Sequence, residues 1–151
     1  MPRHPSLIQL SHDHHHGLAL ALRCRKQALG RLKPMGLAGL RERAEELRAF
    51  LGQNLARHFD AEETVLFPFM RAAIPESVPL IDALLGEHAE LRGFQPKPEG
   101  EAGLAKALFD AGDLLERHIR REERELFPLF EKHAGAADAE AIGQKIGESL
   151  G

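Results

Sequence analysis

The most informative feature of the sequence is a repeated pairing of histidine with glutamate. Residues 57–68 read RHFDAEETVLFP and residues 117–128 read RHIRREERELFP, so both match R-H-x-x-x-E-E-x-x-L-F-P. Side chains four positions apart lie on the same face of a helix. The two pairs are His58 with Glu62 and His118 with Glu122. Imidazole and carboxylate groups together suit iron, manganese and zinc, so the repeat predicts metal chemistry.

Two further histidines lie among apolar residues at helical spacing. His14 is four residues after Leu10, and His88 is four residues after Leu84. In both places an acidic residue directly precedes the histidine, which extends the internal repeat. Histidines crowd positions 12–16, so His15 is the alternative to His14 on this helix. The other histidines of the run, which we expect on a solvated surface, are His12 and His16.

Four long helices would bring these residues together. Ala, Leu, Glu and Arg are abundant, and alternating β-type runs are absent. Apolar residues at three- and four-residue steps predict helices over residues 6–31, 37–73, 78–94 and 102–133. Pro68 should kink or end the second helix, and the tail 134–151 could add a short fifth one. We therefore expect an all-α fold, an up-down four-helix bundle, in one domain over residues 1–151 with its core at about 6–133.

The four histidines and two glutamates all fall on the predicted core-facing stripes. An ionised carboxylate buried alone would cost many kcal/mol, so such groups are paired or bind metal ions. No lysine or arginine falls on these stripes at the same level. Mixed nitrogen and oxygen ligands with bridging carboxylates suit two ions. Each glutamate could span both ions, two histidines could serve each ion, and positions would stay open for a small ligand.

This pattern resembles the hemerythrin-like family, the HHE cation-binding domain, over roughly residues 6–133. The residues that carry the resemblance are Asp13-His14, segment 58–63, Glu87-His88 and segment 118–123, with Leu-Phe-Pro after each of the two segments. The resemblance implies a glutamate-bridged, non-haem di-iron centre. Its implied ligands are His14, His58, Glu62, His88, His118 and Glu122. Zinc and manganese are alternative metals, although two bridging glutamates favour iron.

One position departs from the family pattern. Oxygen-carrying members have a second histidine four residues after the third-helix histidine, where this chain has Arg92. The departure argues against simple oxygen carriage and favours the branch associated with iron sensing, nitric-oxide response or repair of damaged iron centres. We expect a module that binds or senses oxygen, nitric oxide or iron rather than an autonomous enzyme. The alternatives are a di-iron redox enzyme acting on oxygen, peroxide or nitric oxide, and a zinc-stabilised structural bundle.

Composition and charge limit which other classes of binding partner we expect. The net charge is −3 and no apolar run is long enough to span a bilayer, so we expect neither nucleic-acid nor membrane binding. Cys24 is the single cysteine, which fits a reducing, cytoplasmic setting. Glu63 and Glu123 could accept hydrogen bonds from ligand histidines or lie on the surface. The basic run, which we expect in solvent, is Arg120, Arg121 and Arg124. No protein partner is indicated.

Overall fold

The computed structural model describes residues 2–96 and 100–151, and all regular structure in those residues is helical. The α-helices are α1 (Ile8–Ala28), α2 (Gly36–Gly52), α3 (Asn54–Ala61), α4 (Phe67–Ala73), α5 (Val78–Arg92), α6 (Glu101–Arg121), α7 (Phe127–His133) and α8 (Ala136–Leu150). Single turns are η1 (Pro5–Leu7), η2 (Glu62–Leu66), η3 (Pro75–Ser77) and η4 (Glu122–Leu126). The predicted all-α helical bundle is confirmed.

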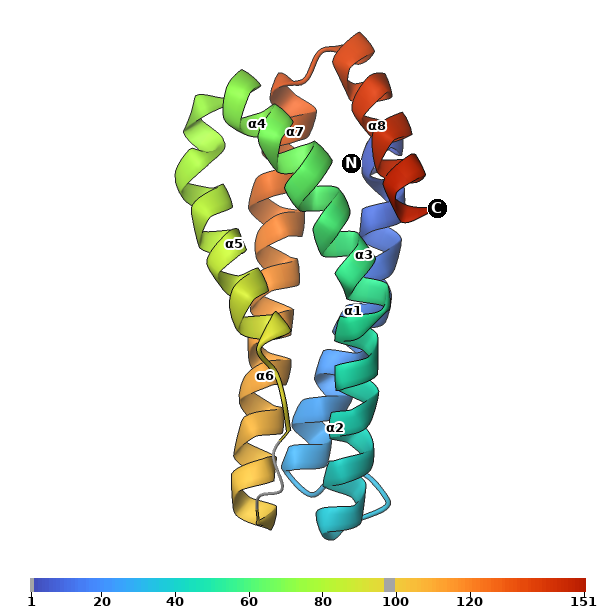
Figure 1. Cartoon of the computed structure of the whole chain (residues 1–151), viewed down its shortest axis with the longest axis vertical. Helices are drawn as coiled ribbons and strands as arrows, with labels where there is room; N and C mark the ends of the chain where they lie inside the picture. The colour runs from blue at the N-terminus through green and yellow to red at the C-terminus, as the bar shows by residue number, and fades with distance from the viewer. Residues whose placement is uncertain (1, 97–99) are drawn as a thin grey trace.

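The helices form long rods that lie side by side (Figure 1). The segments α2, α3 and α4 follow one another along one rod, and α6 and α7 follow one another along a second. The α1 and α5 helices lie alongside these rods, and α1 packs chiefly on α6. Two apolar clusters fill the interior at different heights. One contains Leu66 and Phe127, the other contains Leu55 and Leu115, and the repeated His-Glu segments run between them.

The long helix predicted over residues 37–73 is interrupted twice. Gln53 leaves helical geometry with φ −118° and ψ −75°, which separates α2 from α3. A π-turn, η2, then separates α3 from α4. Of the two outcomes predicted for Pro68, a kink or a helix end, the end does not occur, because α4 continues to Ala73.

The π-turn explains how a proline is tolerated at this position. In a regular α-helix the ring of Pro68 would clash with the carbonyl four residues earlier. The Phe67 N–H instead donates to the carbonyl of Glu62, five residues back, which widens the turn in front of the proline. The second repeat is built identically, since the Phe127 N–H donates to the Glu122 carbonyl. Both widened turns begin at a glutamate that the sequence predicts to bind metal, and such turns are frequent at functional sites.

Close packing of α1 on α6 depends on glycine. A Cβ atom on Gly112 of α6 would lie 2.9 Å from the carbonyl oxygen of Ala21 on α1. A Cβ atom on Gly17 of α1 would lie 2.7 Å from the side chain of Ile119 on α6. The absence of side chains at both places lets the two helices approach, and this places His14 against the end of α6.

The ends of the first and last helices differ from the sequence-based bounds. The first helix ends at Ala28 rather than at residue 31, because Gly30 adopts φ +73° and the Arg31 N–H turns back to the Lys26 carbonyl. The expected fifth helix is present as α8 and spans 15 residues. Its apolar side buries Ala139, Ile142 and Ile146 in the cluster that contains Leu66. None of the helices in the described ranges combines the length and apolar character needed to cross a bilayer.

Candidate metal centre

Six polar side chains meet in the layer between the two apolar clusters. They come from all parts of the bundle: His14 from α1, His58 from α3, Glu62 from η2, His88 from α5, His118 from α6 and Glu122 from η4. Each is at most 2% exposed. These are the six residues that the sequence nominated as ligands, and the structure brings all of them to one place.

Each glutamate has one oxygen atom directed to each half of the cluster. Glu62 places Oε2 3.3 Å from His58 Nε2 and Oε1 3.1 Å from His88 Nε2. Glu122 places Oε1 3.0 Å from His14 Nε2 and Oε2 3.2 Å from His118 Nε2. The two carboxylates therefore span the gap between two pairs of imidazoles.

The donor atoms fall into two overlapping sets that could each hold an ion. One set is His14, His58, Glu62 and Glu122, and the other is His88, His118, Glu62 and Glu122. Within each set the ligand atoms lie within 4.8 Å of one another. Both glutamates belong to both sets, which is the arrangement that two carboxylate-bridged ions require.

The hydrogen bonding of the cluster also fits bound cations. The Nε2 atoms of the four histidines and all four carboxylate oxygens of Glu62 and Glu122 are buried without a hydrogen-bond partner. A buried polar atom left unsatisfied costs about 1–3 kcal/mol, and more for a charged group. So many unsatisfied lone pairs converging on two points would be strongly destabilising unless metal cations or protons bound there.

A second group of four carboxylates surrounds the six residues. These outer carboxylates, as we call them, are Asp13, Glu63, Glu87 and Glu123. The Nδ1 atoms of His58 and His118 lie 3.1 Å from Asp13 and 2.8 Å from Glu87. Each carboxylate can only accept, so Nδ1–H donates and the Nε2 lone pair is left facing inward. This is the usual way in which proteins orient a metal-binding imidazole.

The other two outer carboxylates follow the same rule. His88 Nδ1 lies 2.6 Å from Glu63, and His14 Nδ1 lies 2.6 Å from Glu123. Every outer carboxylate is the sequence neighbour of one of the six residues but holds a histidine on a different helix. From the sequence alone, Glu63 and Glu123 fit either this role or the surface. Nothing in the sequence assigns the role to Asp13 and Glu87 beyond the repeated acidic residue before histidine.

Guanidinium groups hold three of the outer carboxylates from outside. Arg92 Nη1 donates to Glu63 at 2.7 Å, and Arg3 Nη2 donates to Glu123 at 3.1 Å. Arg121 Nη1 lies 3.2 Å from Glu87. Arg121 belongs to the basic run expected in solvent; its side chain is 35% exposed and also forms this ion pair. At Arg92, where oxygen-carrying relatives have histidine, the side chain is 45% exposed and its guanidinium bonds the carboxylate that holds His88.

Aromatic rings fix the planes of two imidazoles. Phe59 stacks on His88 with ring centroids 3.8 Å apart and an interplanar angle of 17°. Phe127 stacks on His14 at 5.5 Å and 11°. These phenylalanines are fully buried, and they limit rotation of the rings that they cover.

Electrostatics in the metal-free cluster tie a proton to His118. Burial alone would lower the pKa of His118, but the carboxylates of Glu122, Glu87 and Glu62 together outweigh burial and raise that pKa to about 10. Burial would raise the pKa of Glu122, yet His118 and His14 hold it well below its usual range. Without a metal, protonated His118 therefore supplies positive charge beside Glu122.

The histidine run on α1 divides between the inside and the outside. His14 is buried at 2% exposure, whereas His12, His15 and His16 are exposed. The helix phase that the sequence left open between His14 and His15 thus places His14 in the cluster.

An all-α bundle whose buried layer contains two sets of His and Glu donors defines a class of cation-binding helical proteins. Residues 6–130 match the hemerythrin HHE cation binding domain, and the chain therefore belongs to that family. No curated protein and no solved structure matches the chain.

Proposed function

We propose that this chain is an up-down four-helix bundle, extended by α8, that holds two non-haem iron ions and binds or senses oxygen, nitric oxide or iron. The observation that carries the proposal is the set of unsatisfied inward-facing atoms, four imidazole nitrogens and four carboxylate oxygens. Their division into two sets with both glutamates in common supports two ions rather than one.

The donor set supports iron over other metals. Each ion would receive two imidazole nitrogens and one oxygen from each bridging carboxylate. Structural zinc sites are closed by four ligands in tetrahedral geometry, commonly with cysteine. Iron accepts a larger coordination number with nitrogen and oxygen ligands, and di-iron carboxylate sites occur in helical-bundle cores. Four protein donors per iron leave positions for a small ligand.

The protein's own groups set what such a centre can do. The outer carboxylates hold Nδ1–H of every imidazole and keep each ring aimed at the centre. Phe59 and Phe127 cover two of the rings and make their surroundings apolar. Bound iron supplies the affinity for diatomic ligands, and the surrounding apolar clusters limit the access of water.

The ligand-binding part of the proposal is tested on iron-loaded protein. Purified protein is exposed in turn to oxygen, nitric oxide and peroxide while its near-ultraviolet and visible spectra are recorded. We expect a stoichiometric spectral change that reverses when the gas is removed. Catalytic consumption of any of the three at many turnovers would instead make the chain a redox enzyme. A spectrum unaffected by all three would refute small-ligand binding.

A further inference from the structure

The outer side of α1 contains a second group of histidines that the metal centre does not use. His12 and His16 are exposed and lie four positions apart, which is one helical turn. Their ring centroids are 5.1 Å apart and the ring planes are nearly perpendicular, at 85°. His14, between them in sequence, points the opposite way into the core. One turn of α1 therefore presents imidazole on both its inner and its outer side.

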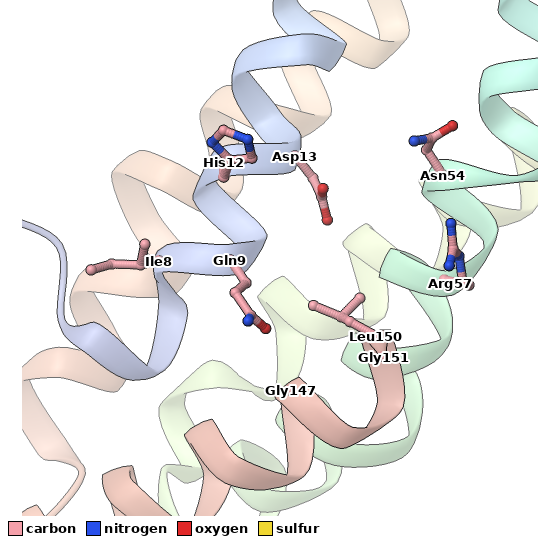
Figure 2. A pocket seen from close by; sticks show the side chains of 9 residues that line it. All are labelled: Ile8, Gln9, His12, Asp13, Asn54, Arg57, Gly147, Leu150 and Gly151. Atoms are coloured by element: carbon pink, nitrogen blue, oxygen red, sulfur yellow. The ribbon is translucent and has the colours of Figure 1, made fainter.

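Both exposed rings border hollows that face α3. Figure 2 shows a hollow of about 410 Å³ between α1, α3 and the end of α8, with His12 and Asp13 on its α1 side and Asn54 and Arg57 on its α3 side. A neighbouring hollow of about 300 Å³ is lined by His16 and again by Asn54. The two imidazoles thus lie beside hollows that share one residue of α3, Asn54.

We propose that His12 and His16 form an exposed binding site for a divalent transition-metal ion, separate from the core centre. Two imidazoles one helical turn apart can both reach one ion, because exposed side chains change rotamer at little cost. Water completes the coordination. Imidazole suits copper, nickel and zinc, whereas calcium and magnesium prefer oxygen ligands. We therefore expect affinity to fall from Cu²⁺ to Ni²⁺ to Co²⁺ to Mn²⁺, with no binding of Mg²⁺.

The test measures Ni²⁺ uptake by equilibrium dialysis of the iron-loaded protein. Wild type should bind one more Ni²⁺ per chain than the variant with His12→Ala and His16→Ala together. The control His133→Ala changes an exposed histidine on α7 and should bind Ni²⁺ like wild type. His15→Ala separates this site from a pairing of His12 with His15 and should also leave uptake unchanged. Equal uptake by wild type and the double variant, or loss of uptake in His15→Ala, would overturn the proposal.

A second background separates this site from the core centre. Ni²⁺ uptake is also compared between the His118→Ala variant, whose core cluster is damaged, and a variant that contains His12→Ala and His16→Ala in addition. The difference of one Ni²⁺ should persist there, because the exposed rings take no part in the core. If it disappears, the extra ion belongs to the core and the exposed site is refuted. Failure of the core to bind iron would leave this difference intact.

Discussion

Asp13 and His58 lie on different helices, yet the Asp13 carboxylate holds the Nδ1 atom of His58 at 3.1 Å. The next residue along α1, His14, turns its Nε2 atom to Glu122 at 3.0 Å. Two consecutive residues of one helix thus serve the same donor set, one as a candidate ligand and one as the support of the other histidine in that set. The same division occurs at Glu87 and His88 on α5. The internal repeat therefore contains the outer carboxylates that hold the histidines as well as the candidate ligands.

The outer carboxylates should control metal affinity. Glu123→Ala removes the acceptor that holds His14 Nδ1, and we expect iron affinity to fall by about 10- to 100-fold. The matched control is Glu125→Ala, which changes an exposed glutamate on the same turn. Affinity is measured by competition with a coloured chelator. The role assigned to Glu123 fails if both variants retain iron equally.

Metal binding should release protons. In the metal-free protein the carboxylates of Glu122, Glu87 and Glu62 raise the pKa of His118 to about 10 against the effect of burial, whereas an unfolded chain has an ordinary value near 6.5. A metal needs the neutral imidazole, so loading at pH 8 should release a proton from His118 and affinity should rise with pH up to about 10. Calorimetry in buffers of different ionisation enthalpy measures the protons. His118→Ala should release fewer, and an unchanged count would contradict the assignment.

The same shift predicts how the stability of the metal-free protein depends on pH. A histidine whose folded pKa is raised stabilises the fold fully below its unfolded pKa. That contribution should be lost as pH rises from about 6.5 through about 10. Urea denaturation measures the free energy of unfolding at each pH across this range. Between pH 6.5 and pH 10 this free energy should change less in His118→Ala than in wild type.

The approach of α1 to α6 should be sensitive to a single methyl group. In Gly112→Ala the new Cβ would lie 2.9 Å from the backbone oxygen of Ala21, and overpacking of this kind costs about 1–3 kcal/mol. Gly86→Ala is the control, because nothing lies within 4 Å of its Cβ and it is exposed within α5. That change should stabilise the protein by about 1 kcal/mol through helix propensity. Urea denaturation measures both, and destabilisation by both or by neither would contradict the packing described.

Cys24 should be inert in the folded protein. Burial raises the pKa of its thiol to about 12, so the reactive thiolate is scarce at neutral pH. We expect alkylation by iodoacetamide at pH 8 to be slow and to accelerate sharply in denaturant. The chain has one cysteine, so the added mass reports this site alone. Rapid alkylation without denaturant would mean that the thiol reaches solvent.

Periodicity was enough to predict the bundle and the inward direction of five of the six polar residues, whereas it left His14 and His15 as alternatives. The spacing of His58 and Glu62 fixes a shared face, and the apolar neighbours of that face show that it is buried. The π-turns were not predictable, because the wider turn changes only which carbonyl accepts a backbone N–H, and Pro68 indicated a kink or a helix end without specifying its form.

The residues that hold the candidate ligands in place were harder to predict from the sequence. Glu87 serves a histidine 31 positions away, and Arg3 reaches Glu123 across 120 positions. Contacts between helices depend on their rotation and height, which helical spacing within one helix does not specify. Arg121 illustrates the same limit, since it follows another arginine in the sequence while its partner Glu87 lies on α5.

Anaerobic titration of the metal-free protein with Fe²⁺, followed by metal analysis after removal of unbound ions, tests the central claim most directly. Wild type should saturate at about two iron ions per chain, as a glutamate-bridged pair requires. His118→Ala removes a donor from one set and should hold clearly less iron, whereas His133→Ala, outside the cluster, should still hold two. Saturation of wild type at one ion or none, or equal iron in His118→Ala and His133→Ala, would contradict the account.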